Sequence, residues 1–132
     1  MKTHLIKQGA YLSQIDNQRG NSVTVDFPVA SGGTGQGPTA FELLAMSLNG
    51  CIATIFTTMA EKKRLTIEYL EIDLEAKTTE GEMEAIDYTL RVKTTASDKD
   101  LETCLELTEK VCPVGRLFHR AGVPFTHRIE RM

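Results

Sequence analysis

The chain contains no tryptophan, and aromatic residues make up only 6% of its 132 positions. So few aromatic side chains argue against a base-stacking platform for single-stranded nucleic acid. A basic excess is absent too, because 15 lysines and arginines stand against 18 aspartates and glutamates, for a net charge of −3. Nucleic-acid binders usually carry such an excess. We therefore expect no nucleic-acid partner.

Long apolar runs are also scarce. Residues 1–4 lead into a mixed polar stretch rather than the apolar core of a signal peptide. The least charged stretch, residues 43–60, is 18 residues long, which is the lower limit for a membrane span. It contains Ser47, Asn49 and three threonines. We therefore predict a buried helix in a cytoplasmic protein without a membrane partner, and the alternative is a membrane span.

The spacings typical of metal and nucleotide sites are missing. The three cysteines and three histidines form no Cys-x-x-Cys or His-x-x-x-His pair, so we expect no metal, and nothing points to another cofactor. The glycine-rich segment 31–38 has no lysine, which a phosphate-binding Walker loop requires. We interpret this segment as a flexible connector. Anion binding at the start of the following helix is the alternative.

Alternating and helical patterns of apolar residues predict one α+β domain over residues 1–132. Turn residues at 16–21 separate short strand-like runs and predict a hairpin, with or without a third strand. Capping boxes at Thr39–Glu42 and Ser97–Asp100 each predict a helix start. A long hairpin is expected between these helices. The strand-like runs are 5–6, 10–12, 23–27, 66–79, 83–95 and 125–130.

The first predicted helix is apolar on nearly every side. Its main stripe has spacings of three and four, and further apolar residues lie off that stripe. A helix of this kind is surrounded by protein, and in so short a chain this indicates a partner subunit. We expect the helix to end near residues 61–64. The stripe consists of Phe41, Leu44, Leu48, Cys51, Ile55 and Met59.

Each cysteine allows more than one interpretation. Cys51 lies on the apolar stripe and is either a small core residue or a nucleophile, whereas Cys104 within an amphipathic helix fits the core. Cys112 precedes Pro113, a residue favoured in the first turn of a helix. Cys112 therefore lies at a helix start or at a break between two helices, where a thiolate is stabilised.

Two motifs resemble those of a known family. Residues Gly37–Cys51 have the form GPT-x-x-ELL-x-M-x-L-x-GC, and Val111–Val114 reads VCPV. Together with the order of elements, these motifs resemble the OsmC/Ohr family of thiol-dependent peroxidases, in particular its OsmC-like branch. The resemblance covers nearly the whole chain, and the two cysteine motifs are its specific part.

The resemblance implies a fold and a reaction. The implied fold is the OsmC-like α+β fold, with antiparallel sheets, a long buried central helix and an intertwined homodimer. Cys51 matches the peroxidatic cysteine and Cys112 the resolving cysteine, whereas Cys104 has no counterpart. The implied substrate is an organic hydroperoxide, with hydrogen peroxide as a further one, in oxidative-stress defence. An external thiol or a lipoylated protein would be the reductant.

The chain departs from the family pattern at two places. Characterised members carry a glutamate ten residues before the peroxidatic cysteine, where this chain has Phe41; Glu42 lies one position later. Glu42 is thus a catalytic candidate, and its helix-capping role is the alternative. The family also supplies an arginine from the N-terminal strands. Arg19 is the only arginine before Cys51, so it is the local candidate, and a solvated turn residue is the alternative.

Two other functions stay open at the level of sequence. A non-catalytic dimer of the same fold could use its cysteines as a redox sensor, or could bind a small apolar ligand or a protein. A cysteine-dependent acyl or thiol transferase would need a base, and the histidines offer none at a recognisable spacing. A peroxidase needs a thiolate, and a nearby guanidinium would favour that form of Cys51.

Overall fold

The computed structural model describes residues 1–132. The chain forms two compact units, residues 1–44 and 45–132, and each is described here by itself. The boundary falls within helix α1 (Ala40–Lys62), which starts and ends close to the predicted positions.

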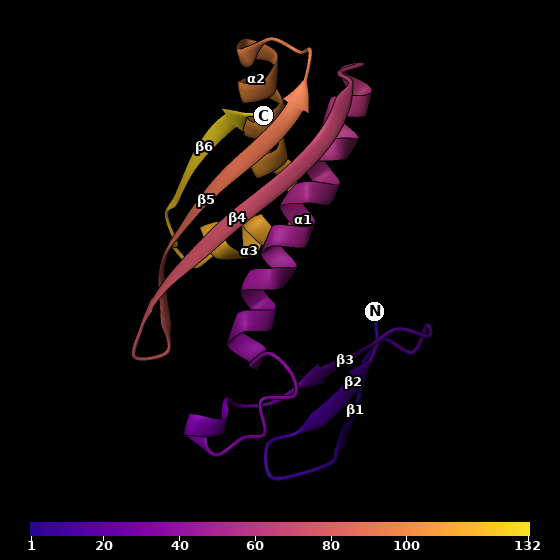
Figure 1. Ribbon diagram of the computed structural model, residues 1–132, viewed down its shortest axis with the longest axis vertical. Helices are drawn as coiled ribbons and strands as arrows, with labels where there is room; N and C mark the ends of the chain where they lie inside the picture. The colour runs from indigo at the N-terminus through magenta and orange to yellow at the C-terminus, as the bar shows by residue number, and fades with distance from the viewer. The chain divides into compact units, whose positions relative to one another are not determined.

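The first unit is built on three short strands. β1 (His4–Lys7), β2 (Ser13–Asp16) and β3 (Ser22–Val25) form an antiparallel sheet in the order β1-β2-β3 (Figure 1). The predicted turn between β2 and β3 is confirmed, since Asn17 and Asn21 bond through backbone and side chains. The predicted strand at residues 10–12 is wrong. The amides of Gln8 and Gly9 both donate to the Leu12 carbonyl, which makes this segment a turn.

The glycine-rich segment is organised around Asp26, which is 1% exposed. Its carboxylate accepts from the Thr34 hydroxyl at 2.5 Å and from the amides of Phe27, Thr34 and Gln36. A Cβ at Gly33 would lie 1.9 Å from the Phe27 carbonyl oxygen, so only glycine fits there. The interpretation as a flexible connector is therefore wrong. A carboxylate of the chain itself already occupies amides of the kind that bind anions.

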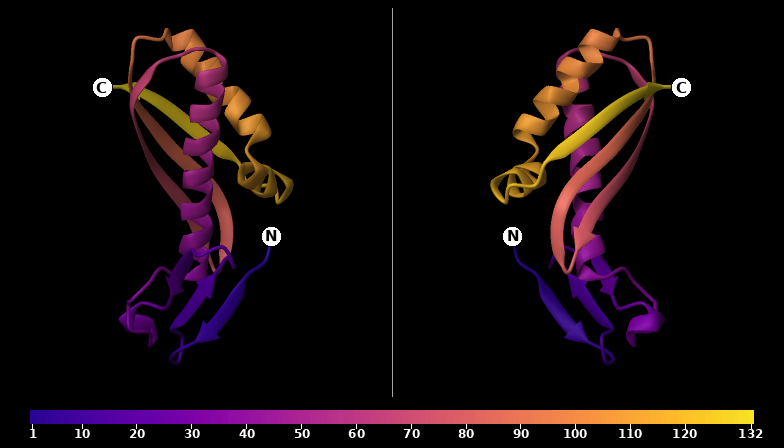
Figure 2. Two further views of the ribbon diagram at one scale, coloured as in Figure 1. Left: turned by 90° about the vertical axis from the view of Figure 1, so that its right-hand side faces the viewer. Right: turned by 90° about the vertical axis from the view of Figure 1, so that its left-hand side faces the viewer.

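The second unit is a three-stranded sheet with helices on one face (Figures 1 and 2). β4 and β5 form the long hairpin predicted from the sequence, closed by a two-residue turn in which Glu80 and Gly81 both have positive φ. β6 pairs parallel with β5. The elements are β4 (Ile67–Thr79), β5 (Glu82–Thr94), α2 (Asp98–Val111), α3 (Pro113–Arg120) and β6 (Phe125–Arg131).

The apolar core lies between this sheet and its helices. Alternate residues of β5 point toward the helices, whereas the opposite face carries ion pairs such as that of Arg91 with Glu71. The buried stripe of α1 repeats every four residues and is turned by about one residue from the predicted stripe. Cys51, Ile55 and Met59 lie beside it, partly buried. The central core residues are Leu48, Ile52, Phe56, Ala60, Ile86, Leu90, Val92, Leu101 and Leu105.

The faces of α1 that point away from the sheet are not covered by other residues of the chain. By length and composition α1 could cross a membrane, with a mean hydropathy of 1.6, but such a helix is equally typical of a protein core. Only 22% of its apolar window is buried within the chain. Met46 is 57% exposed and Leu44 is 41% exposed. The helix therefore has apolar surface that the chain does not cover.

Candidate redox site

Cys51 lies in the middle of α1 and is partly buried. Leu48 and Ile52 on the same helix are fully buried and fix the rotation of α1 against the sheet. The Asn49 side chain donates to the Ile72 carbonyl at 3.1 Å, which ties this turn of α1 to β4. Cys51 is thus held at a defined position along α1 relative to β4 of the second sheet.

Cys112 is the junction between α2 and α3, so the predicted break between two helices is confirmed. Its amide donates to the Thr108 carbonyl at 2.8 Å and closes α2. Its sulfur accepts from the Gly115 amide at 3.4 Å and caps α3, in which Pro113 occupies the first turn. The residue is 1% exposed, so its thiol is enclosed by protein.

The two sulfurs face each other. The Cys112 Sγ donates to the Cys51 Sγ at a distance of 2.9 Å, and both thiols are free. A disulfide bond is about 0.9 Å shorter than this separation. The two cysteines singled out in the sequence are therefore in reach of a disulfide with only a small movement.

The surroundings of Cys112 favour the protonated form of its thiol. Burial and, after it, the neighbouring Cys51 together raise the pKa of the Cys112 thiol to about 11, against the lowering effect of the Gly115 and Val114 amides. Cys112 is thus a protonated donor at neutral pH.

Cys104 lies apart from this pair. It is fully buried, as predicted, and its thiol donates to the Phe56 carbonyl at 3.6 Å. Burial raises the pKa of the Cys104 thiol. A protonated, enclosed thiol of this kind is a core residue.

Arg19 and Glu42 belong to the first unit. Arg19 is exposed in the turn between β2 and β3, where its amide donates to Asn17 Oδ1 at 2.9 Å. Glu42 completes the predicted capping box: its carboxylate accepts from the Thr39 amide at 2.8 Å, and its amide donates to the Thr39 hydroxyl at 3.1 Å. The cap is confirmed, whereas a role for either residue beside Cys51 stays a prediction.

Sequence reasoning missed a polar cluster in the second unit. Glu109 Oε1 accepts from the Tyr88 hydroxyl at 2.5 Å and lies 3.0 Å from His127 Nδ1, and Glu102 lies 3.4 Å from His127 Nε2. The sequence shows no local partner for His127 because these partners come from other elements. A signal did exist: Tyr88 and His127 are register partners, and alternation places both on the helix-facing side.

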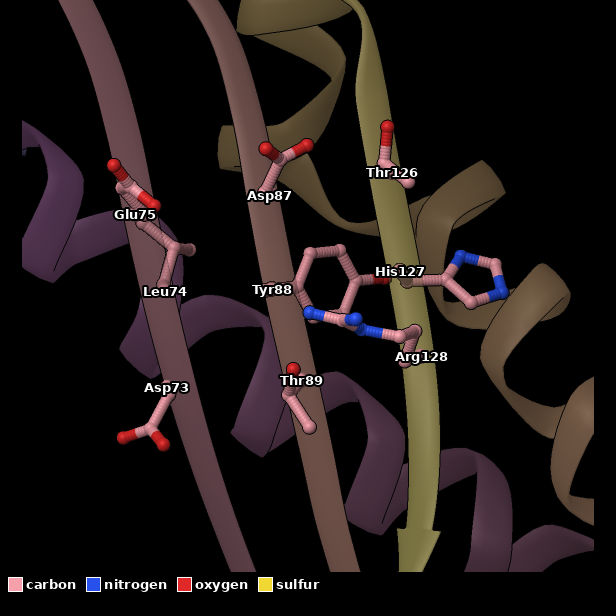
Figure 3. Close-up of a pocket in the computed structure, with 9 residues that line it drawn as sticks. All are labelled: Asp73, Leu74, Glu75, Asp87, Tyr88, Thr89, Thr126, His127 and Arg128. Atoms are coloured by element: carbon pink, nitrogen blue, oxygen red, sulfur yellow. The ribbon is translucent and has the colours of Figure 1, made fainter.

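A pocket of about 500 Å³ crosses β4, β5 and β6, and Figure 3 shows its nine lining residues. Side chains of the charged sheet face, such as Asp87 and Arg128, contribute to it. Neither facing cysteine lines this pocket. No group of three or more histidine, cysteine, aspartate or glutamate side chains is arranged so that it could hold a metal ion.

An α+β fold with two facing free thiols defines the class: a protein with a dithiol centre between its helices. A family model described as OsmC-like protein matches residues 33–128, and the chain belongs to this family. The recognition made from the two cysteine motifs is thereby confirmed.

Solved structures confirm the fold. The chain is similar to an OsmC-like protein from Mycoplasma pneumoniae, with 13% identity over 99% of this chain and 94% of that one and a TM-score of 0.83. It is similar to a hypothetical protein from Aquifex aeolicus, with 20% identity over 99% and 95% and a TM-score of 0.83. An organic hydroperoxide resistance protein OsmC from Legionella pneumophila shares 16% identity over 98% and 97%, with a TM-score of 0.71. No curated protein matches the chain.

Proposed function

We propose that this OsmC-like protein is a cytoplasmic thiol-dependent peroxidase that reduces organic hydroperoxides in oxidative-stress defence. The observation that carries the proposal is the 2.9 Å separation of the Cys51 and Cys112 sulfurs. Family membership supports it, as does the Legionella pneumophila relative, which is named an organic hydroperoxide resistance protein.

The proposed reaction has two steps within the chain. The Cys51 thiolate attacks the outer oxygen of the hydroperoxide, the O–O bond breaks, and the alcohol leaves after taking a proton. The Cys51 sulfenic acid then condenses with Cys112: an S–S bond forms, and the hydroxyl group leaves with the Cys112 proton as water. Two thiols and one hydroperoxide thus give one disulfide, one alcohol and one water.

The cycle closes through an external thiol. A dithiol or a lipoylated protein attacks the disulfide and returns both cysteines to thiols by thiol–disulfide exchange. Cys112 is 1% exposed and Cys51 is only partly buried, so we propose that the reductant attacks at Cys51. Hydrogen peroxide would be a second substrate.

Turnover tests the proposal directly. We expect the reduced chain to consume tert-butyl hydroperoxide continuously when a dithiol is present, and Cys51→Ser to abolish this activity. Cys112→Ser should leave a single burst and an oxidised Cys51. Cys104→Ser is the matched control, because that thiol lies in the core, and it should keep the wild-type rate. Undiminished turnover in Cys51→Ser would overturn the proposal.

A redox sensor of the same fold is the second candidate. The observation that favours it is the enclosure of Cys112, which limits access of a reductant to one of the two sulfurs of the disulfide. A sensor would form the Cys51–Cys112 disulfide with hydroperoxide yet show no sustained turnover with any dithiol. The same assay therefore separates the two functions.

We also propose that Arg19 and Glu42 complete the peroxidase site. Arg19 would favour the Cys51 thiolate, and Glu42 would organise the guanidinium. Removing one favourable charge should raise the pKa of a thiol by about one unit, so Arg19→Gln should slow Cys51 oxidation about tenfold at neutral pH. Glu42→Gln preserves the capping box and isolates the effect of the charge. Unchanged oxidation rates in both variants would remove both residues from the site.

We further propose that the chain works as a homodimer. The first unit buries no apolar side chain, although an isolated small sheet needs an apolar face packed on something. α1 has uncovered apolar residues, and its threonines 54, 57 and 58 bond to their own helix. A second copy supplies matching apolar surface for both. Sedimentation should show a dimer, and Met46→Glu should weaken it; a monomer at micromolar concentration would contradict this proposal.

A further inference from the structure

The cluster around Glu109 lies one helical turn before Cys112. One carboxylate oxygen of Glu109 meets Tyr88 from β5 and His127 from β6, so the last turn of α2 is attached to two neighbouring strands. Tyr88 is 3% exposed, and burial together with Glu109 raises the pKa of its hydroxyl, which stays protonated and donates. These contacts fix the position of the last turn of α2 against the sheet.

The helix that carries Cys51 is also bonded to this sheet through a polar side chain. The Asn49 side chain, two residues before Cys51, donates to the Ile72 carbonyl of β4. Both helices that carry a reactive cysteine thus have a polar side chain bonded to the sheet within one turn of that cysteine. Both cysteines therefore have a neighbouring residue bonded to the same sheet.

We infer that Glu109 is a positioning residue for the resolving thiol: with Tyr88 and His127 it holds the end of α2 so that Cys112 faces Cys51. This role deepens the proposed function and rests on Cys112 being the partner of Cys51. Tyr88 is buried, whereas the side chains of Glu109 and His127 are 23% and 25% exposed. The contacts of Glu109 with two strands restrict the position of the α2 end.

The geometric effect should fall on one step alone. Cys51 oxidation by hydroperoxide forms no bond to Cys112, whereas disulfide closure requires each sulfur to lie within about 1 Å of its place in the reduced protein. Misplacing one reactant by about 1 Å can slow an intramolecular step by one to two orders of magnitude. Loosening α2 should therefore slow closure and leave the first step unchanged.

The test follows both steps in a single turnover, with one equivalent of tert-butyl hydroperoxide and dimedone trapping of the sulfenic acid. We expect Glu109→Ala to slow disulfide closure about tenfold and to leave the rate of Cys51 oxidation at the wild-type value. Glu109→Gln keeps an oxygen for the Tyr88 hydroxyl and should restore most of the closure rate. Glu106→Ala, on the same helix, is the matched control and should close like the wild type.

Tyr88→Phe keeps the packed ring and provides a second variant should Glu109→Ala not fold. It should also slow closure alone. Closure at the wild-type rate in both variants, or an equal slowing of both steps, would overturn the inference.

Diamide separates this inference from the proposed function. It oxidises the facing thiols to a disulfide by accepting their two hydrogens and requires no hydroperoxide chemistry. If the wild-type chain ignores hydroperoxide but closes with diamide, and Glu109→Ala closes about tenfold more slowly, the positioning role stands and the peroxidase proposal falls. Equal diamide rates would reject the positioning role.

Discussion

Different interactions stabilise each of the two units of the chain. Residues 45–132 bury a continuous apolar core between a sheet and its helices, and the facing thiols lie at the edge of this core. Residues 1–44 bury one side chain, the carboxylate of Asp26, which organises a loop through four hydrogen bonds. Residues 45–132 are thus stabilised by burial of apolar side chains. Residues 1–44 depend on polar contacts and on an apolar surface that another molecule supplies.

The contrast explains the exposed apolar side chains of the first unit. Ile6 is 56% exposed, Tyr11 is 51% exposed and Val29 is 72% exposed, whereas the corresponding core residues of the second unit are fully covered. Ile6 lies on β1, Tyr11 in the turn before β2 and Val29 after β3, and so many exposed apolar side chains on one small unit favour an interaction surface. The proposed second copy of the chain gives this surface its cover.

Neighbouring leucines on α1 give the largest expected difference between the units. Leu48 is fully buried in the second unit, and Leu44, one turn earlier in the first unit, is 41% exposed. Leu48→Ala should lower the free energy of unfolding by about 3 kcal/mol. Leu44→Ala should cost less than about 1 kcal/mol in dilute protein, where chains are apart. Urea unfolding measures both, and equal losses would contradict the contrast.

Alkaline pH should weaken the second unit through Cys112. Its folded pKa of about 11 lies above the ordinary value of 9.0, so the stabilisation is complete below pH 9 and is lost as the pH rises toward 11. Unfolding of the reduced chain at pH 8 and pH 10.5 should show this loss, and Cys112→Ser should lack it. The same loss in Cys112→Ser would assign it to other groups.

Removing a helix cap should lower the stability by the same amount in both units, because a cap is a local contact. Thr39 caps α1 and Ser97 caps α2, each accepting from an amide three residues later at 3.1 Å. Thr39→Ala and Ser97→Ala should each destabilise the chain by about 1 kcal/mol in thermal unfolding. A loss confined to Ser97→Ala would show that the first helical turn contributes nothing on its own.

Acid should loosen the first unit locally, with the smallest effect on the whole chain. The Thr34 hydroxyl and three backbone amides hold the pKa of Asp26 below its ordinary value. The stabilisation is therefore present above that ordinary value and is lost as the pH falls through the lowered one. The protection factors of the Thr34 and Gln36 amides against hydrogen exchange should fall in acid before those of the core amides do. Asp26→Asn should show the lower protection already at neutral pH.

Local patterns predicted the parts of the fold that local chemistry decides. Both capping boxes, the long hairpin with its turn at Glu80 and Gly81, and the helix break at Cys112 follow from neighbouring residues, and the structure confirms them. The resemblance paired Cys51 with Cys112, and the structure places their sulfurs together.

Contacts between distant residues decided what the sequence did not reveal. The buried stripe of α1 is turned by about one residue because its packing depends on the sheet, which spacing along the helix does not specify. The Glu109 cluster joins β5, β6 and α2 across intervals of 18 and 21 residues. Asp26 meets Thr34 through a loop whose glycines looked flexible in the sequence.

The intact mass of the reduced chain after one equivalent of organic hydroperoxide shows whether Cys51 and Cys112 react as a pair. We expect the loss of two hydrogens, which marks a Cys51–Cys112 disulfide. Cys51→Ser or Cys112→Ser should prevent this loss, whereas Cys104→Ser should not. An unchanged mass with both thiols still free would contradict the account and would leave the fold without the proposed chemistry.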